Sequence, residues 1–325
     1  MSENGYCGAR LVANARQSFQ GSIVLGKGFI LSPQQAEDLI LRDPRNKDVL
    51  FPYLNGEDLN SRPDSSASRW VINFHDWPEE RAREYTEPFA IVERDVKPER
   101  LKNNRKVYRD YWWQYAEKRP AMLKAVEQFD RVLVVALVSR TVMPISVPTG
   151  QVFSHMLGIF ATSEMSQLAL LDSGIHGAWV AAQASTLETR IRYTPSDVYE
   201  TMPQPAAATA AMTAAGAELT KFRQMLMRER QLGLTKLYNL VHDPKNTDSE
   251  IEDLRGHHRA VDEAVVNAYG WLDLNIEHNF FDTRQGKRFT FPGGVRTEIL
   301  NRLLELNHEE YERIDKRNSA ESLLF

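Results

Sequence analysis

The densest cluster of basic residues lies between residues 97 and 109, with one acid, Glu99, among six cations. Clustered lysines and arginines displace counterions from a nucleic-acid backbone, so the cluster is a candidate phosphate-contacting strip. A solvated helix face is an equally good reading of the same charges. The six residues, called the basic strip below, are Lys97, Arg100, Lys102, Arg105, Lys106 and Arg109.

A second group of candidates follows segments of strand-like sequence. The nearly continuous apolar run 131–138 is followed by Ser139, Arg140 and Thr141, so polar groups stand at the end of a buried strand. Arg190, Arg192 and Tyr193 lie close together later in the chain. Arginine can donate two hydrogen bonds to guanine O6 and N7, which favours base contacts by Arg140, Arg190, Arg192 and Tyr193. A plain strand end and a salt-bridged strand are the alternatives.

Residues for catalysis are sparse. Adenine amino-methylation needs a glycine-rich cofactor loop and an Asp/Asn-Pro-Pro-aromatic loop, but the chain has no Pro-Pro dipeptide. Gly26-Lys27-Gly28 lacks a third glycine and favours a tight turn between strands. We therefore expect no S-adenosylmethionine binding and no methylation by this chain alone.

Other reaction centres are also weakly indicated. Asp64, Asp95 and Lys97 imitate a metal-dependent nuclease site, and this enzyme reading stays open as an alternative. The single cysteine, Cys7, excludes an intrachain disulfide and a cysteine-based zinc site. His257 and His258 lack the spacing of a zinc protease and are expected at the surface.

Composition restricts the class of protein. The 325 residues are 42% hydrophobic and 26% charged, as in ordinary globular chains, with a net charge of −4. Residues 1–205 carry 24 basic and 25 acidic residues, so any nucleic-acid affinity must be local. No apolar stretch is long enough for a membrane span, and the first ten residues lack a signal-peptide core. The expected location is the cytoplasm, without membrane contact.

The pattern of elements predicts an α+β fold. Strands are expected within 18–31 around a turn and at 70–74, 89–93, 131–139 and 152–160. A helix should start at the cap Ser32, and another should run to about residue 184. Trp112, Trp113 and Tyr115 cannot share one helix face, so core packing is favoured for them.

The composition changes at 202–217, where two prolines precede an alanine-rich stretch. Helices are predicted at 218–241, at 248–269 with a left-handed cap at Gly270, and at 295–314. We therefore divide the chain into a mixed α/β domain, 1–205, and a mostly helical C-terminal module, 206–325.

An ordered set of segments resembles one family along nearly the whole chain. The segments are FQGSIVLGKGF (19–29), FPYLNGEDLN (51–60), RWVINF (69–74), VKPERLKNNRKVYRDYWWQYAEKRP (96–120), RIRYTPSDVYETMPQP (190–205), LTKLYN (234–239), AYGW (268–271), GKRFTF (286–291) and LLELNHEEY (303–311). They resemble the C-terminal part of MmeI-like type IIG restriction–modification enzymes and related phage-defence adenine methyltransferases. One departure is Met202 where the family has Phe in Phe-Pro-x-Pro.

The resemblance implies a DNA target-recognition domain at 1–205, followed by the helical module. In the family, nuclease and methyltransferase domains precede these parts. The resemblance thus implies a specificity subunit or fragment that binds double-stranded DNA, with S-adenosylmethionine held by a methyltransferase partner. A scaffold or inhibitor that mimics the recognition domain, binding the enzyme but not DNA, is a further alternative.

Overall fold

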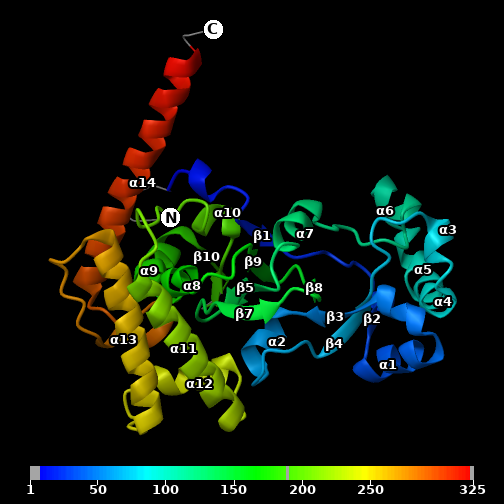
Figure 1. Cartoon of the computed structure of the whole chain (residues 1–325), viewed down its shortest axis with the longest axis horizontal. Helices are drawn as coiled ribbons and strands as arrows, with labels where there is room; N and C mark the ends of the chain where they lie inside the picture. The colour runs from blue at the N-terminus through cyan, green and yellow to red at the C-terminus, as the bar shows by residue number, and fades with distance from the viewer. Residues whose placement is uncertain (1–7, 188–189, 323–325) are drawn as a thin grey trace.

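The computed structural model describes residues 8–187 and 190–322, so Cys7 lies outside the described residues. The chain packs around two hydrophobic clusters arranged along its longest axis (Figure 1). The smaller cluster lies in an N-terminal lobe built mainly from residues 24–115. The larger one continues from the central strands into the C-terminal helices. Within the described residues, none of the helices is both long and apolar enough to cross a bilayer.

The N-terminal lobe is organised by a four-stranded sheet in the order β2-β4-β3-β8. Its strands pair antiparallel except for β3 and β8, which are parallel. The strands are β2 (Ile30–Leu31), β3 (Leu50–Leu54), β4 (Arg69–Ile72) and β8 (Val152–Phe153). The helices of the chain up to residue 110 are η1 (Val12–Asn14), η2 (Lys27–Phe29), α1 (Pro33–Arg42), η3 (Pro44–Asp48), α2 (Gly56–Ser61), α3 (Glu79–Ala82), α4 (Thr86–Asp95), α5 (Lys97–Arg100) and α6 (Lys106–Asp110). Of these, η1 is bonded to residues 199–202 and α2 packs on β5, so both lie outside the lobe.

Helix α1 begins where the sequence predicts. Ser32 and Gln35 form a reciprocal capping box, and Pro33 occupies the first turn. The expected strands around residues 18–31 also form, but they do not pair with each other. The first of them, β1 (Ser18–Gln20), joins the central sheet, whereas β2 joins the sheet of the lobe.

The strand predicted at 89–93 is wrong, because these residues lie inside α4. A short apolar run does not distinguish a buried strand from a buried helix segment. Here Phe89, Val92 and Val96 are buried at helical spacing, against the lobe core. The prediction for the aromatic residues is confirmed, since Trp112, Trp113 and Tyr115 are all buried in the same core.

The central sheet has the order β1-β9-β5-β7, and all its pairs are antiparallel. The apolar run 131–139 forms β5 (Arg131–Ala136) and β6 (Val138–Ser139), and 152–160 contributes β8 and β9 (Leu157–Phe160). The remaining elements of this part are α7 (Pro120–Val126), β7 (Ile145–Pro148), α8 (Met165–Asp172), α9 (Gly174–Gln183), β10 (Ser185–Leu187), β11 (Arg190–Arg192) and α10 (Pro195–Val198).

The C-terminal region is mostly helical, as predicted. Helix α13 ends at Gly270 in the left-handed conformation (φ 74°), which confirms the expected cap. A hairpin of two strands, absent from the prediction, precedes the last helix. The elements are α11 (Ala210–Glu229), α12 (Leu234–Val241), α13 (Ser249–Tyr269), β12 (Asn279–Thr283), β13 (Gly286–Thr290) and α14 (Gly293–Ser322).

The proposed junction near residue 205 lies beside a short exposed segment, 206–208. The hydrophobic core continues across it, because Leu219 and Leu226 of α11 belong to the same cluster as Leu168 of α8. The division at 205/206 therefore remains a prediction from the sequence. Residues on both sides of it share one hydrophobic core.

Candidate nucleic-acid interface

The three predicted base-contacting arginines lie at one small sheet. Strand β11 pairs antiparallel with both β10 and β6, and Ile191 stands opposite Ser139. Arg140 directly follows β6, so it lies beside Arg190 and Arg192 although 50 residues separate them in sequence. Arg140, Arg190 and Arg192 are all exposed, and we call this group the arginine edge.

The strand period explains why the arginines of β11 act together. Successive side chains of a strand point to opposite faces, so Arg190 and Arg192 share one face. Ile191, between them, packs against the large hydrophobic cluster. The partly buried isoleucine thus fixes which face of β11 the two arginines occupy.

A local turn directs Arg140. The Thr141 N–H donates to Ser139 Oγ at 3.1 Å, and the Ser139 hydroxyl donates to the Thr141 carbonyl. These bonds form a turn with Arg140 at its centre. The Arg140 side chain is exposed.

Tyr193 does not belong to an exposed interface, which corrects the prediction for it. Its side chain is 1% exposed and packs edge-to-face on Phe160. Its hydroxyl lies 3.2 Å from Nε2 of the buried His176. Burial raises the pKa of Tyr193 well above its usual value. Tyr193 therefore anchors the end of β11 inside the core.

Arg100 is the second correction. Only 2% of this residue is exposed, so it cannot reach a DNA backbone. Its guanidinium donates to the carbonyls of Leu25, Val24 and Gln114 at 2.8, 3.0 and 2.8 Å. Burial lowers the pKa of Arg100 from its usual value. Its role in the structure is to join separate segments of the N-terminal lobe.

The other members of the basic strip differ in how far they are already bonded. Lys97 pairs with Glu93 at 2.8 Å, and Arg109 donates to the carbonyls of Asn103 and Asn104. Arg105 donates to the Tyr108 hydroxyl at 2.7 Å. Lys102 and Lys106 are exposed, and Lys106 has only a long ion pair, 4.0 Å, to Asp110.

The basic strip and the arginine edge are not one surface. Figure 1 places α5 and α6 at one end of the longest axis, whereas β10, which pairs with β11 of the arginine edge, lies beyond the central sheet. A ligand that contacts both groups must therefore be extended.

The residues of the nuclease alternative are engaged separately. Asp64 accepts from the Ser66 hydroxyl at 2.8 Å, whereas Asp95 pairs with its neighbour Arg94. Lys97 is bound to Glu93. Among the described residues, no three His, Cys, Asp or Glu side chains group as metal ligands would. The geometry gives the nuclease reading no support.

The glycines of 26–28 have a packing explanation. A Cβ on Gly28 would lie 2.5 Å from Asp95 Cβ, and Gly26 has a φ of 154° against Val96. The loop packs closely against the end of α4, and only glycine has room for this approach. The glycines are therefore explained by a contact inside the protein. These residues do not fit a cofactor cradle.

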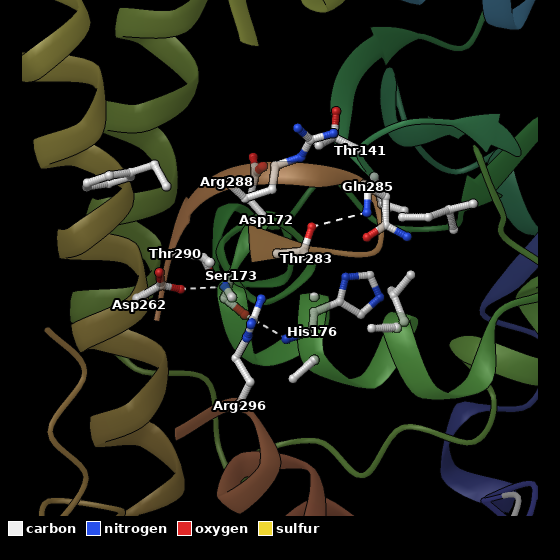
Figure 2. A pocket seen from close by; sticks show the side chains of 18 of the residues that line it. Thr141, Asp172, Ser173, His176, Asp262, Thr283, Gln285, Arg288, Thr290 and Arg296 are labelled. Carbon is white, nitrogen blue, oxygen red and sulfur yellow. Dashed lines mark hydrogen bonds between the residues drawn. The ribbon is translucent and has the colours of Figure 1, made fainter. Parts of the chain in front are cut away.

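A cavity of about 690 Å³ opens beside the arginine edge, between α9, the β12–β13 hairpin and α14. Figure 2 shows Arg288 and Arg296 on opposite sides of the start of α9. Four arginines from three segments line this cavity: Arg140, Arg284, Arg288 and Arg296. Burial lowers the pKa of Arg288, and nearby Arg140 lowers it further.

Three histidines of the cavity wall, His176, His242 and His258, have lowered pKa values. Burial lowers the pKa of His176 to about 4 and that of His242 to about 3. Nε2 of His258 is hydrogen-bonded to the Tyr238 hydroxyl at 2.8 Å. Burial also lowers the pKa of His258. His258 lies in the cavity wall, which corrects the expectation of a surface position for it, whereas His257 is half-buried.

The cavity arginines were not among the predicted site residues. Residues 284–288 contain Arg284, Lys287 and Arg288 around Gly286, whose φ is 94°. Three cations in five residues around a turn glycine are a signal that could have marked this hairpin as a candidate site.

The family model described as "MmeI, target recognition domain" matches residues 12–206, and the chain belongs to this family. A solved structure of the Type IIL restriction-modification enzyme MmeI in complex with DNA has the same fold, with a TM-score of 0.65 and 17% identity. The alignment covers 91% of this chain and 36% of that one, so the chain spans about a third of the enzyme's length. A comparison with curated proteins gives no match.

Proposed function

We propose that this chain recognises a specific sequence in duplex DNA, with the arginine edge contacting base edges. The observation that carries the proposal is the common face of Arg190 and Arg192 beside Arg140. All three lie within the matched residues 12–206. A similar enzyme of known structure is in complex with DNA.

The arrangement suits base readout. Arginine side chains on a strand held by the partly buried Ile191 and the buried Tyr193 keep a fixed angle to a groove. A bidentate arginine–guanine contact is worth roughly 1–3 kcal/mol of discrimination. Since the domain is not basic overall, specificity depends on such local contacts.

The basic strip, without Arg100, is proposed as a sequence-independent contact to DNA phosphates. Lys102 and Lys106 are the most available members. Lys97, Arg105 and Arg109 would have to share or exchange their present hydrogen bonds. The strip therefore contributes to affinity more than to sequence choice.

A methyltransferase domain or subunit completes the proposed function. It would hold S-adenosylmethionine and methylate adenine N6 in a restriction–modification or phage-defence system. The chain would act as its specificity part, in the cytoplasm. The packed loop at 26–28 supports a division of labour in which the cofactor is bound elsewhere.

The test is selection of bound duplexes from a random-sequence library, with the purified chain and with its methyltransferase partner. We expect an enriched motif and an affinity that falls as salt rises. Arg228→Gln, an exposed arginine of α11 outside the arginine edge, is the matched control and should keep the motif. Absence of any motif and of salt-sensitive binding in both preparations would contradict the proposal and favour the scaffold alternative.

A further inference from the structure

We propose that the cavity between α9, the β12–β13 hairpin and α14 binds a single nucleotide, with its phosphate at the arginine rim and its base inside. The nucleotide could be free or unstacked from bound DNA. The free form stands independently of the proposed function, whereas the DNA form rests on it.

The rim has the chemistry of a phosphate site. Within the described parts of the chain, Arg140, Arg284, Arg288 and Arg296 form no ion pair with a carboxylate. Arg288 donates to the carbonyl of Lys287 at 3.0 Å, and Arg296 donates to that of Asp282 at 3.3 Å. Each guanidinium has five N–H groups, so these bonds leave further donors for a ligand. An anion placed among these arginines would relieve their mutual repulsion and accept charge-assisted hydrogen bonds.

The interior has the chemistry of a base site. His242 Nδ1 accepts from the Phe289 N–H at 3.2 Å, so the proton of this neutral imidazole lies on Nε2. That Nε2 is a buried donor without a partner in the structure, and Oδ1 of Asp172 is likewise a buried acceptor without one. Both residues line the cavity. A nucleobase carries donors and acceptors that can hydrogen-bond to such groups. Its flat faces can pack against Phe289 and Val180.

Size agrees with this ligand. The cavity, about 690 Å³, falls within the roughly 300–1,000 Å³ typical of small-molecule sites. Figure 2 shows the side chains of Thr141, Gln285 and His176 along the same space, so further polar contacts are available.

Gly177 offers a way to block the cavity without changing its charge. It lies on α9 in the cavity wall, and a Cβ there would meet nothing within 4 Å. Gly177→Leu should therefore fold and occupy part of the space. Gly177→Ala is the control, because a methyl group leaves most of the cavity open and alanine favours a helix.

The binding experiment uses calorimetry with the whole chain, the four deoxynucleoside 5′-monophosphates, and inorganic phosphate alone. At least one nucleotide should bind at least tenfold tighter than phosphate. The double variant Arg288→Gln/Arg296→Gln and Gly177→Leu should each weaken that binding tenfold or more, with Gly177→Ala and Arg228→Gln unchanged. A second arm compares a duplex carrying one unpaired nucleotide with a fully paired duplex.

The outcomes are distinct. Tight mononucleotide binding supports the free form; a preference for the unpaired duplex that Gly177→Leu abolishes supports the DNA form. If neither occurs, or if binding survives in folded Gly177→Leu, the inference is overturned. Motif selection on paired duplexes should persist in Gly177→Leu, so its loss would count against the proposed function separately.

Discussion

The basic strip and the arginine edge carry similar side chains but use them differently. The strip gathers six cations within 13 residues, yet Arg100 is buried and Arg109 is bonded to backbone carbonyls. The arginine edge takes three arginines from two distant segments and leaves all of them exposed. Charge density along a sequence therefore says little about availability. The backbone that carries each cation decides whether it serves the fold or a ligand.

The largest expected effect is a loss of stability when Arg100 of the basic strip is replaced. Arg100→Met removes three hydrogen bonds and leaves buried carbonyls unpaired, so we expect a loss of about 3 kcal/mol in unfolding free energy. Denaturant unfolding measures it, with the exposed Lys102→Met as control, expected within about 0.5 kcal/mol of the parent chain. Equal stabilities of the two variants would mean that Arg100 is not structural.

The next effect concerns specificity at the arginine edge. Arg192→Ala and Arg140→Ala should each cost roughly 1–3 kcal/mol on the selected duplex and relax the motif at one base pair. Affinity for unrelated duplexes should change little. Competition between the selected and scrambled duplexes measures the difference. A uniform loss on both duplexes would assign these arginines to phosphates instead.

A smaller effect is expected from the exposed lysines of the basic strip. Lys102→Gln/Lys106→Gln should weaken binding to every sequence alike, by about tenfold or less at low salt. The slope of log affinity against log salt should fall by up to about 2, since each lost phosphate contact removes about 0.9. A salt titration with selected and scrambled duplexes tests this. A loss confined to one sequence would contradict a backbone role.

Local signals in the sequence were reliable where a single residue type determines the geometry. The cap at Ser32 and the left-handed Gly270 are both formed as predicted. The α+β class, with a mixed α/β part followed by a mostly helical part, was also predicted from the sequence pattern. The helix over 89–93 was missed because a run of four apolar residues, 89–92, fits either period.

The site was less predictable because it depends on long-range pairing. Arg140 lies beside β11 and its arginines only through the pairing of β6 with β11, which no local pattern reveals. Arg100 and Tyr193 have polar ends and were read as exposed, yet the core provides carbonyls and a histidine for them. The sequence identifies a polar group but not the partner that burial supplies for it.

The smallest expected effect distinguishes Tyr193, which anchors β11 in the core, from the arginines that are proposed to contact DNA. His176 Nδ1 lies 2.7 Å from the Leu171 carbonyl and donates to it, so its Nε2 accepts from the Tyr193 hydroxyl. Tyr193→Phe removes that donor and leaves a buried nitrogen unpaired, which should cost about 1 kcal/mol in unfolding free energy. DNA affinity and motif should stay unchanged, because the hydroxyl is enclosed by the core. Tyr111→Phe, at a half-exposed tyrosine, is the control for loss of a hydroxyl without a buried partner. If Tyr193→Phe changed the motif without changing stability, Tyr193 would contact DNA after all, and β11 would have to move on binding.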